Sequence, residues 1–162
     1  MRSRKVRALI ICAVCAVLVG ATLLFALGGG PRTGEYESEY GTRYRITKDE
    51  ITRLGVLTAF SEDGEEFSVD VVYTYDVYTA DFEKRIEMRL SRIEYGGKDQ
   101  VIKNLVGSVN RDIAAGGAEK YTFAGLSLKA RTDGEYARGA GNVRINGELL
   151  KRTGRIEATE ER

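Results

Sequence analysis

The sequence predicts a mainly β domain, built as a small antiparallel barrel or sandwich with one inserted helix, that follows an N-terminal transmembrane helix. Three observations predict this fold. The first is an uncharged stretch over 8–27, near the start of the 162-residue chain. The second is a body rich in Tyr, Val, Ile and Thr with frequent Gly, which is typical of strands and turns. The third is a series of seven or eight short strand patterns around a single helical pattern over 99–115.

The uncharged stretch follows residues 1–7, which carry four basic side chains and no acid. As a helix it would rise about 30 Å, the thickness of the hydrocarbon core of a bilayer. Because a basic flank favours the cytoplasmic side, we expect a single-pass membrane protein with its N-terminus in the cytoplasm and with 34–159 outside. The alternative is a signal peptide cleaved near Ala26-Leu27-Gly28, which would secrete the same body.

Composition narrows the classes of function. The chain has no His, and its two cysteines, Cys12 and Cys15, both lie inside the uncharged stretch. The body therefore has neither a Ser/His/Asp triad nor a Cys/His pair, and no imidazole to hold zinc or copper. Lys and Arg number 25 against 24 Asp and Glu, with four of the bases in residues 1–7, so the body has no basic footprint for nucleic acid. We expect no catalytic residues, no metal and no cofactor.

After a linker over 28–33, the clearest signal is a hairpin from Val56 to Val77. Asp63-Gly64 suits a two-residue turn with positive φ angles, and this turn would place Val56 opposite Val71 and Phe60 opposite Phe67. The second strand alternates apolar and polar residues, so five apolar or aromatic side chains should point to the same face of the sheet. These are Val69, Val71, Tyr73, Tyr75 and Val77.

The middle of the body combines an ambiguous segment with the one clear helix. Residues 85–95 fit a strand or a helix, and we favour a strand with a bulge near Ser91-Arg92 that brings Ile93 inward. Over 99–115 an apolar stripe recurs at helical spacing, and Asp99 is placed to cap its start. The stripe consists of Val101, Ile102, Leu105, Val106, Val109 and Ile113, and Gly116-Gly117 follows it.

The remaining patterns are short strands and turns. The apolar parity of the segment from Tyr121 to Ala130 changes at Gly125, which indicates a bulge. Asp133-Gly134 and Asn146-Gly147 are typical of tight hairpin turns. Short strands are expected over Glu135–Arg138, Val143–Ile145 and Arg155–Thr159, and a frayed tail over 160–162.

An ordered series of short motifs over about 34–138 resembles the lipocalin-like small barrel modules of bacterial exported proteins and lipoproteins. The series comprises Gly34-Glu35-Tyr36, Tyr44-Arg45-Ile46-Thr47, Val72-Tyr73-Thr74-Tyr75, the alternating run 85–90, the segment 121–128 and Gly134-Glu135-Tyr136. The resemblance implies a barrel and an exported compartment rather than an activity. This chain departs from the pattern because it inserts a helix over 98–117 and lacks the lipid-attachment cysteine.

A weaker similarity is to band-7 (prohibitin-like) domains. It consists of a membrane helix, the strand Val69–Val77, and a helix that ends Asn110-Arg111-Asp112-Ile113. This similarity implies a fragment of a membrane scaffold. That family would continue with a long charged helix, whereas this chain continues with the strand patterns from Tyr121 to Ala130.

These features predict a membrane-anchored, non-catalytic binding or interaction module of the cell envelope. Its partners would be the bilayer, through 8–27, and either a small ligand inside the barrel or an envelope protein. The candidate ligand-lining residues are Phe60, Phe67, Tyr73, Tyr75 and Arg92, with Arg92 as the anchor for an anion. Two alternatives stay open: side chains fill the barrel and the bulge turns Arg92 outward, or two carboxyl groups about 5–10 Å apart in a cleft form a hydrolase site.

Overall fold

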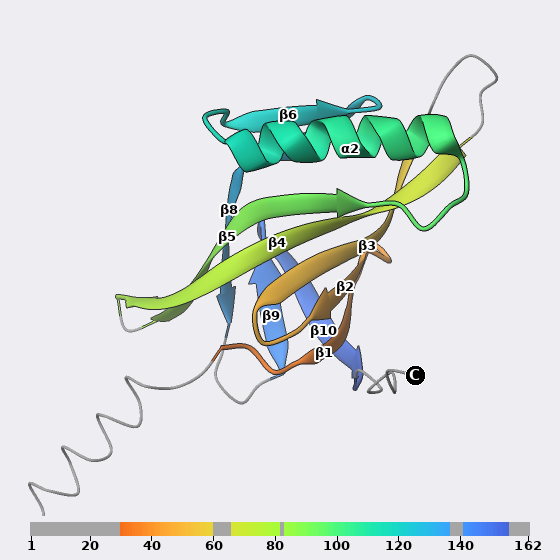
Figure 1. The fold of residues 1–162 in the computed structure, drawn as a ribbon. Coiled ribbons are helices and arrows are strands. Elements are labelled where there is room, and N and C mark those ends of the chain that lie inside the picture. Colours follow the sequence, from red (N-terminus) through yellow and green to blue (C-terminus); the bar gives the residue numbers. More distant parts are fainter. Residues whose placement is uncertain (1–29, 60–65, 82, 137–140, 156–162) are drawn as a thin grey trace, which may run out of the picture. The chain divides into compact units, whose positions relative to one another are not determined.

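The computed structural model of the protein describes residues 30–59, 66–81, 83–136 and 141–155 (Figure 1). The expected membrane helix (8–27), Phe60 and the expected Asp63-Gly64 turn lie outside these ranges. Within them, no helix has both the length and the apolar character needed to cross a membrane. The strands all belong to the compact unit of the chain that begins at Pro31.

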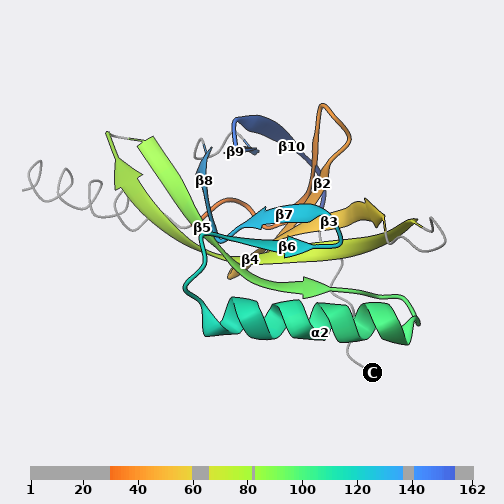
Figure 2. The ribbon, with the colours of Figure 1, turned by 90° about the horizontal axis from the view of Figure 1, so that it is seen from above.

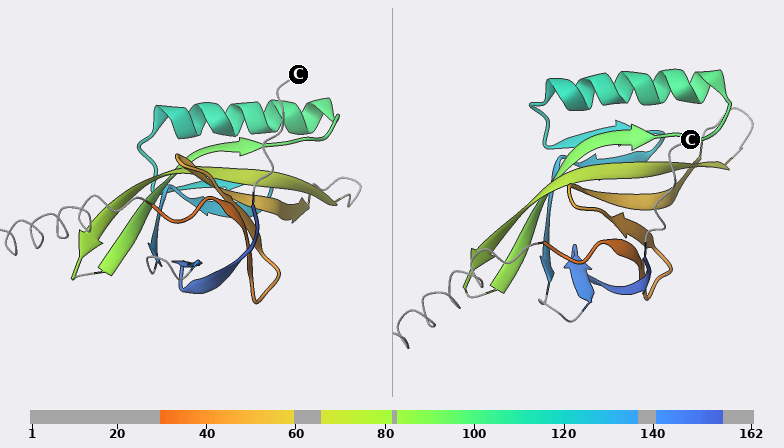
Figure 3. Two further views of the ribbon diagram at one scale, coloured as in Figure 1. Left: turned by 90° about the horizontal axis from the view of Figure 1, so that it is seen from below. Right: turned by 60° about the horizontal axis from the view of Figure 1, so that its bottom comes forward.

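Eight antiparallel strands close into a barrel in the order β1-β10-β9-β8-β5-β4-β3-β2 (Figures 1 and 3). Their bounds are β1 Gly34–Ser38, β2 Arg43–Ile46, β3 Glu50–Ala59, β4 Glu66–Ala80, β5 Glu83–Glu94, β8 Arg131–Tyr136, β9 Asn142–Ile145 and β10 Glu148–Gly154. Between β5 and β8 the chain forms the helix α2 (Gln100–Ala115) and a hairpin of β6 (Lys120–Phe123) and β7 (Leu126–Lys129). The predicted mainly β antiparallel fold with one inserted helix is confirmed, and its sheet forms a barrel rather than a sandwich.

The barrel encloses a cluster of buried side chains, which we call the barrel core. Because alternate residues of a strand point to opposite faces, the apolar residues of each strand share the inner face. The barrel core consists of Tyr36, Tyr44, Ile46, Ile51, Ile86, Met88, Tyr136, Val143, Ile145 and Leu150. Tyr73, Tyr75 and Val77 of β4 pack against it.

A second core lies where the β3–β4–β5 part of the sheet extends beyond the barrel. There α2 and the β6–β7 hairpin cover the sheet, and α2 runs alongside β5 (Figure 2). The second core consists of Val56, Val69, Val71, Leu90, Ile93, Ile102, Val106, Ile113, Phe123 and Leu128. Tyr73 packs against both cores and therefore lies at their junction.

The helix α2 has the ends that the sequence predicts. The Asp99 carboxylate accepts hydrogen bonds from the backbone N–H groups of Val101 (2.7 Å) and Ile102 (3.2 Å), which satisfies two donors of the first turn. Gly116 caps the other end with a positive φ of 71°. The predicted stripe is wrong only at Val101, which is 58% exposed, because it lies about 100° round the helix from the buried Ile102.

The side chain of Asn110 covers the edge of β5 at Ile93, beyond the pairing of β5 with β8. That pairing covers only Lys84–Arg89, so Ile93 has no strand neighbour on this side. Asn110 of α2 takes the place of a neighbouring peptide. Its Oδ1 accepts the Ile93 N–H (2.8 Å), and its Nδ2 donates to the Ile93 carbonyl (2.9 Å). This pair of bonds fixes α2 against the sheet.

The predicted strand over 85–95 and its bulge are confirmed. Val72 pairs with Arg92 and Tyr73 with Leu90, so Ser91 is the extra residue. The predicted register between β3 and β4 is wrong by two residues, because Val56 pairs with Val69 rather than with Val71. The predicted faces survive this error because side chains alternate with a period of two residues.

The reason for the shifted register is the length of the connection, because the six residues between the paired Ala59 and Glu66 are more than a two-residue turn holds. A second bulge, at Gly55 in β3, changes the register by one further residue, so that Arg53 pairs with Val71. Gly55 has a φ of +60°, and its N–H donates to the Asp70 carboxylate (2.8 Å).

Three glycine signals had different outcomes. Asn146-Gly147 forms the predicted tight turn, with φ angles of 52° and 79°. Gly125 forms a two-residue turn with Ala124 and creates the β6–β7 hairpin, so the predicted bulge there is wrong. Asp133-Gly134 lies inside β8 and is no turn. A glycine is required at this position because a Cβ on residue 134 would come within 2.8 Å of the Arg144 carbonyl oxygen of β9.

The predicted short strands near the C-terminus had different outcomes. The strand expected over Val143–Ile145 is confirmed as β9. Of the strand expected over Glu135–Arg138, Glu135 and Tyr136 form the end of β8, and residues 137–138 lie outside the described residues. The last described strand, β10, ends at Gly154, so Arg155 lies after it. The rest of the strand expected over Arg155–Thr159, and the tail 160–162, lie outside the described residues.

Candidate functional site

The predicted ligand-lining residues do not form one site. Phe67 belongs to the second core, where its ring meets those of Tyr95 and Phe123 edge to face at centroid distances of 5.8 and 6.0 Å. Tyr75 packs on the barrel core, and its hydroxyl donates to the Thr47 carbonyl (2.9 Å). The two rings therefore line different parts of the molecule, and Tyr73 lies between them.

Arg92 is not an open anchor for an anion. The bulge at Ser91 places it opposite Val72, on the face of β4 that also carries Asp70 and Thr74, and its guanidinium binds two carboxylates. Its Nη2 donates to Glu50 (3.1 Å) and its Nε to Glu94 (2.7 Å). The hydrogen bond from Arg92 lowers the pKa of Glu50, which keeps this carboxyl ionised.

The barrel interior is filled by its own side chains. Ile46, Ile51, Ile86 and Leu150 are completely buried, and the large ring of Tyr36 is only 1% exposed. The Tyr36 hydroxyl donates to the Arg32 carbonyl at the end of the barrel where the described chain enters (2.6 Å). An eight-strand barrel has room for its side chains or for one small ligand, and here the side chains occupy the centre.

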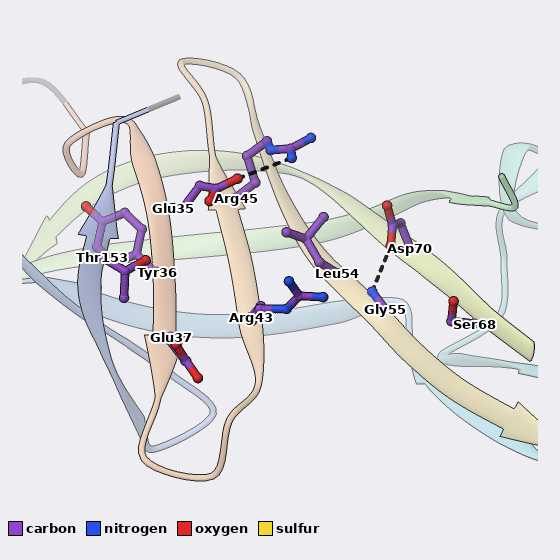
Figure 4. Close-up of a pocket in the computed structure, with 10 residues that line it drawn as sticks. All are labelled: Glu35, Tyr36, Glu37, Arg43, Arg45, Leu54, Gly55, Ser68, Asp70 and Thr153. Carbon is purple, nitrogen blue, oxygen red and sulfur yellow. Dashed lines mark hydrogen bonds and ion pairs between the residues drawn. The ribbon is translucent and has the colours of Figure 1, made fainter. Parts of the chain in front are cut away.

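The outer wall of the barrel is hollowed instead. A groove of about 340 Å³ crosses five neighbouring strands, from β10 over β1, β2 and β3 to β4 (Figure 4). We call it the outer groove. Its lining residues are Glu35, Tyr36, Glu37, Arg43, Arg45, Leu54, Gly55, Ser68, Asp70 and Thr153.

The charges of the outer groove are only partly paired. Arg45 forms an ion pair with Glu35 (3.3 Å), and Asp70 is bound by the Gly55 N–H. Glu37 and Arg43 are opposite each other across β1 and β2, and neither forms an ion pair or a hydrogen bond through its side chain with any described residue. The groove therefore offers one open negative and one open positive group.

A second hollow, of about 420 Å³, adjoins the outer groove at Thr153. Its charged lining residues are all basic: Arg32, Lys151, Arg152 and Arg155. The Arg152 guanidinium donates to the Thr33 carbonyl through Nε (3.2 Å) and Nη2 (2.8 Å), which fixes its position. None of the four forms an ion pair within the described part of the chain, so this hollow is a positive end to the groove.

Sequence reasoning missed Arg53. It occupies an inward-facing position of β3, because its cross-strand partners Tyr44 and Val71 are both core residues. Its Nε is buried and has no hydrogen-bond partner among the described residues. The signal was present, because Arg53 is two residues from the inward-facing Ile51. Because alternate side chains of a strand point to the same face, this spacing alone would have placed Arg53 on the inner face.

The described residues contain no group of three or more His, Cys, Asp or Glu side chains that could hold a metal ion. Comparisons with protein-family models, with curated proteins and with solved structures found no match. From the geometry described above, the candidate site consists of the outer groove, the basic hollow beside it and the inward-facing Arg53.

Proposed function

We propose that this protein is a membrane-tethered, non-catalytic interaction module of the cell envelope, whose outer groove binds a polar segment of a partner protein. The observation that carries this proposal is the contrast between a barrel interior filled with buried side chains and an outer wall hollowed across five strands. A filled interior favours a protein partner over an enclosed small ligand.

The charges of the groove indicate what the partner segment looks like. Glu37 and Arg43 are open to pair with a basic and an acidic group of the partner, and the half-buried Leu54 between the arginine and the bulge offers an apolar contact. Complementary charges of this kind confer specificity more than affinity. The partner segment therefore carries charges of both signs with an apolar residue near them.

The tether and the family likeness are parts of the same proposal. The uncharged stretch 8–27 behind four basic residues supports a single membrane anchor with the body outside the cytoplasm. Lipocalins share the closed up-and-down barrel architecture, which supports the resemblance noted in the motifs. A catalytic role is not part of the proposal.

Site-specific photo-crosslinking in membranes of the native host tests this function. A photoreactive residue replaces Ser68, an exposed lining residue of the groove, in the full-length chain, and the same residue replaces Thr74, an exposed outward position of β4, as the control. We expect one protein of the envelope to crosslink from position 68 and not from position 74. Equal crosslinking from both positions would contradict the proposed groove.

A charge swap provides the matched variant. Because Glu37 and Arg43 are cross-strand partners, Glu37→Arg combined with Arg43→Glu keeps an opposite-charge pair and leaves the net charge unchanged. With the photoreactive residue at Ser68 in the same groove, the swap should abolish the crosslink without changing the thermal unfolding midpoint. Full crosslinking in the swapped protein would mean that the groove does not recognise its partner by charge.

A further inference from the structure

We infer that Arg53, Tyr44 and Tyr73 form a binding site for a small oxyanion, a carboxylate or phosphate group, at the rim of the barrel. This site is separate from the outer groove, because its three side chains belong to inward-facing positions. It goes beyond the proposed function, since it would bind a small anion rather than a protein.

The position of Arg53 places it at the rim. The pairing of β2 with β3 ends at Leu54, one residue after Arg53, and beyond this point β3 continues into the extended sheet of the second core. Arg53 is itself half-buried, so the residue keeps some contact with solvent, while its Nε is buried. An ion would reach the side chain through this contact with solvent.

The charge of Arg53 is uncompensated by the described residues. None of their carboxylates forms an ion pair with it, in contrast to Arg45 and Arg92, which are both paired. A partly buried guanidinium without a counter-ion is costly, and its planar set of N–H donors matches the oxygens of a carboxylate or phosphate. The missing partner is thus an anion with two or more oxygens.

Two phenol groups add donors beside this charge. The hydroxyls of Tyr44 and Tyr73 have no hydrogen-bond partner among the described residues. Burial raises the pKa of Tyr44 to about 12 and also raises the pKa of Tyr73, so both remain protonated donors at neutral pH. The charge of Arg53, the cross-strand partner of Tyr44, lowers both pKa values in part.

Glu148 is the carboxylate whose charge raises the pKa of Tyr44, and it forms its hydrogen bond with a residue outside the site. It accepts a hydrogen bond from the Thr42 hydroxyl (3.3 Å) and lies outside ion-pair distance of Arg53. The site therefore keeps a positive charge with two neutral donors, a combination that recurs where proteins bind oxyanions.

The test follows the side-chain Nε–H signal of Arg53 by NMR in the full-length protein in a neutral detergent. The signal is assigned by its loss in Arg53→Lys. Sodium acetate and sodium phosphate are added separately at constant ionic strength, with sodium chloride as the balance. We expect a saturating shift with at least one of the two, and the tighter of them identifies a carboxylate or a phosphate as the ligand group. Linear drift with both, or the same saturation with chloride, would overturn the site.

Matched variants separate binding from a structural role of Arg53. With the backbone N–H of Leu54 as the reporter, Arg53→Lys should weaken the affinity at least tenfold and Tyr44→Phe several-fold. Arg131→Lys makes the same substitution at an exposed position and should leave the affinity within twofold. An unchanged affinity in a folded Arg53→Lys protein would also refute the proposal.

Discussion

The two cores of this protein protect the edges of their sheets in different ways. In the barrel every strand has a hydrogen-bonded neighbour on each side, so the backbone itself closes the sheet. Around the second core, the edge of β5 is covered by the side chain of Asn110 and by one backbone bond from Leu90 N–H to the Ala130 carbonyl. On the β3 side, the Thr58 hydroxyl donates to the carbonyl of Ala124 in the β6–β7 turn.

This difference shows where the fold is vulnerable. A ladder of backbone bonds survives the loss of any one side chain, whereas a cover attached by a few side-chain bonds does not. We therefore expect the second core to open at lower free energy than the barrel, as a separate local unit. The following variants test that expectation.

The largest effect is expected from a matched pair of isoleucine truncations. Ile86 in the barrel is completely buried, and Ile113 of α2 is 8% exposed. Ile86→Ala should lower the free energy of unfolding by about 3–5 kcal/mol, and Ile113→Ala by about 2–3 kcal/mol, because the helix can settle into the space that the side chain leaves. Chemical denaturation of the full-length chain measures both losses. A greater loss from Ile113→Ala would reverse the comparison.

Asn110→Ala isolates the attachment of α2. It leaves both the N–H and the carbonyl of Ile93 without their partner, which should cost about 1–3 kcal/mol. Amide hydrogen exchange should accelerate at Ile93 and along α2 and stay unchanged in β9 and β10. Asn104→Ala, an exposed position of the same helix, is the control. Uniform acceleration across the barrel would mean that the two cores open together.

Asp99→Ala removes the cap of α2 and nothing from the barrel. The loss of two hydrogen bonds to the first turn should destabilise the protein by about 1 kcal/mol. Asp99→Asn, which keeps a capping oxygen, should recover most of this loss in thermal unfolding. If the alanine variant were as stable as the original, the first turn of α2 would not contribute to the cover.

The smallest effect concerns the ion pair of Arg92 with Glu50, on the outer face near the junction of the two cores. Because the folded pKa of Glu50 is lowered, the pair stabilises the protein above the unfolded pKa, about 4.3, and this contribution disappears as pH falls through the folded value. Both side chains are about one-third exposed, so the contribution should be below about 1 kcal/mol.

Glu50→Gln measures this contribution. Denaturation at pH 7 should show the variant slightly less stable than the original protein, and the difference should vanish near pH 2. A difference that stayed constant with pH would mean that the charge of Glu50 is not what stabilises the pair.

Local signals in the sequence predicted the elements that local chemistry decides. The Asp99 cap, the Ser91 bulge and the Asn146-Gly147 turn follow from residues close together in the chain. The Asp133-Gly134 signal misled because the reason for Gly134 is the close approach of β9, a contact between strands that the local sequence does not contain. The β3–β4 register was missed because the Asp63-Gly64 signal predicts a two-residue turn, whereas six residues separate the paired Ala59 and Glu66.

The candidate site was harder to predict than the fold. The outer groove draws its lining from five strands, and no single strand pattern shows which outward residues meet. The predicted aromatic lining failed because β4 is long enough to serve both cores, so Phe67 and Tyr75 on one strand belong to different clusters. The alternation of side chains along β3 does predict that Arg53 faces inward. It does not predict that none of the described carboxylates forms an ion pair with Arg53.

The position of the insert between β5 and β8 has a consequence for how this architecture can vary. Because β5 and β8 are themselves neighbours in the ring, the whole segment from α2 to β7 leaves the barrel and returns to it without interrupting the ring of eight strands. A gene that gained or lost residues in this segment would still encode a closed barrel. A change of length confined to this segment therefore leaves the pairing of the eight barrel strands as it is.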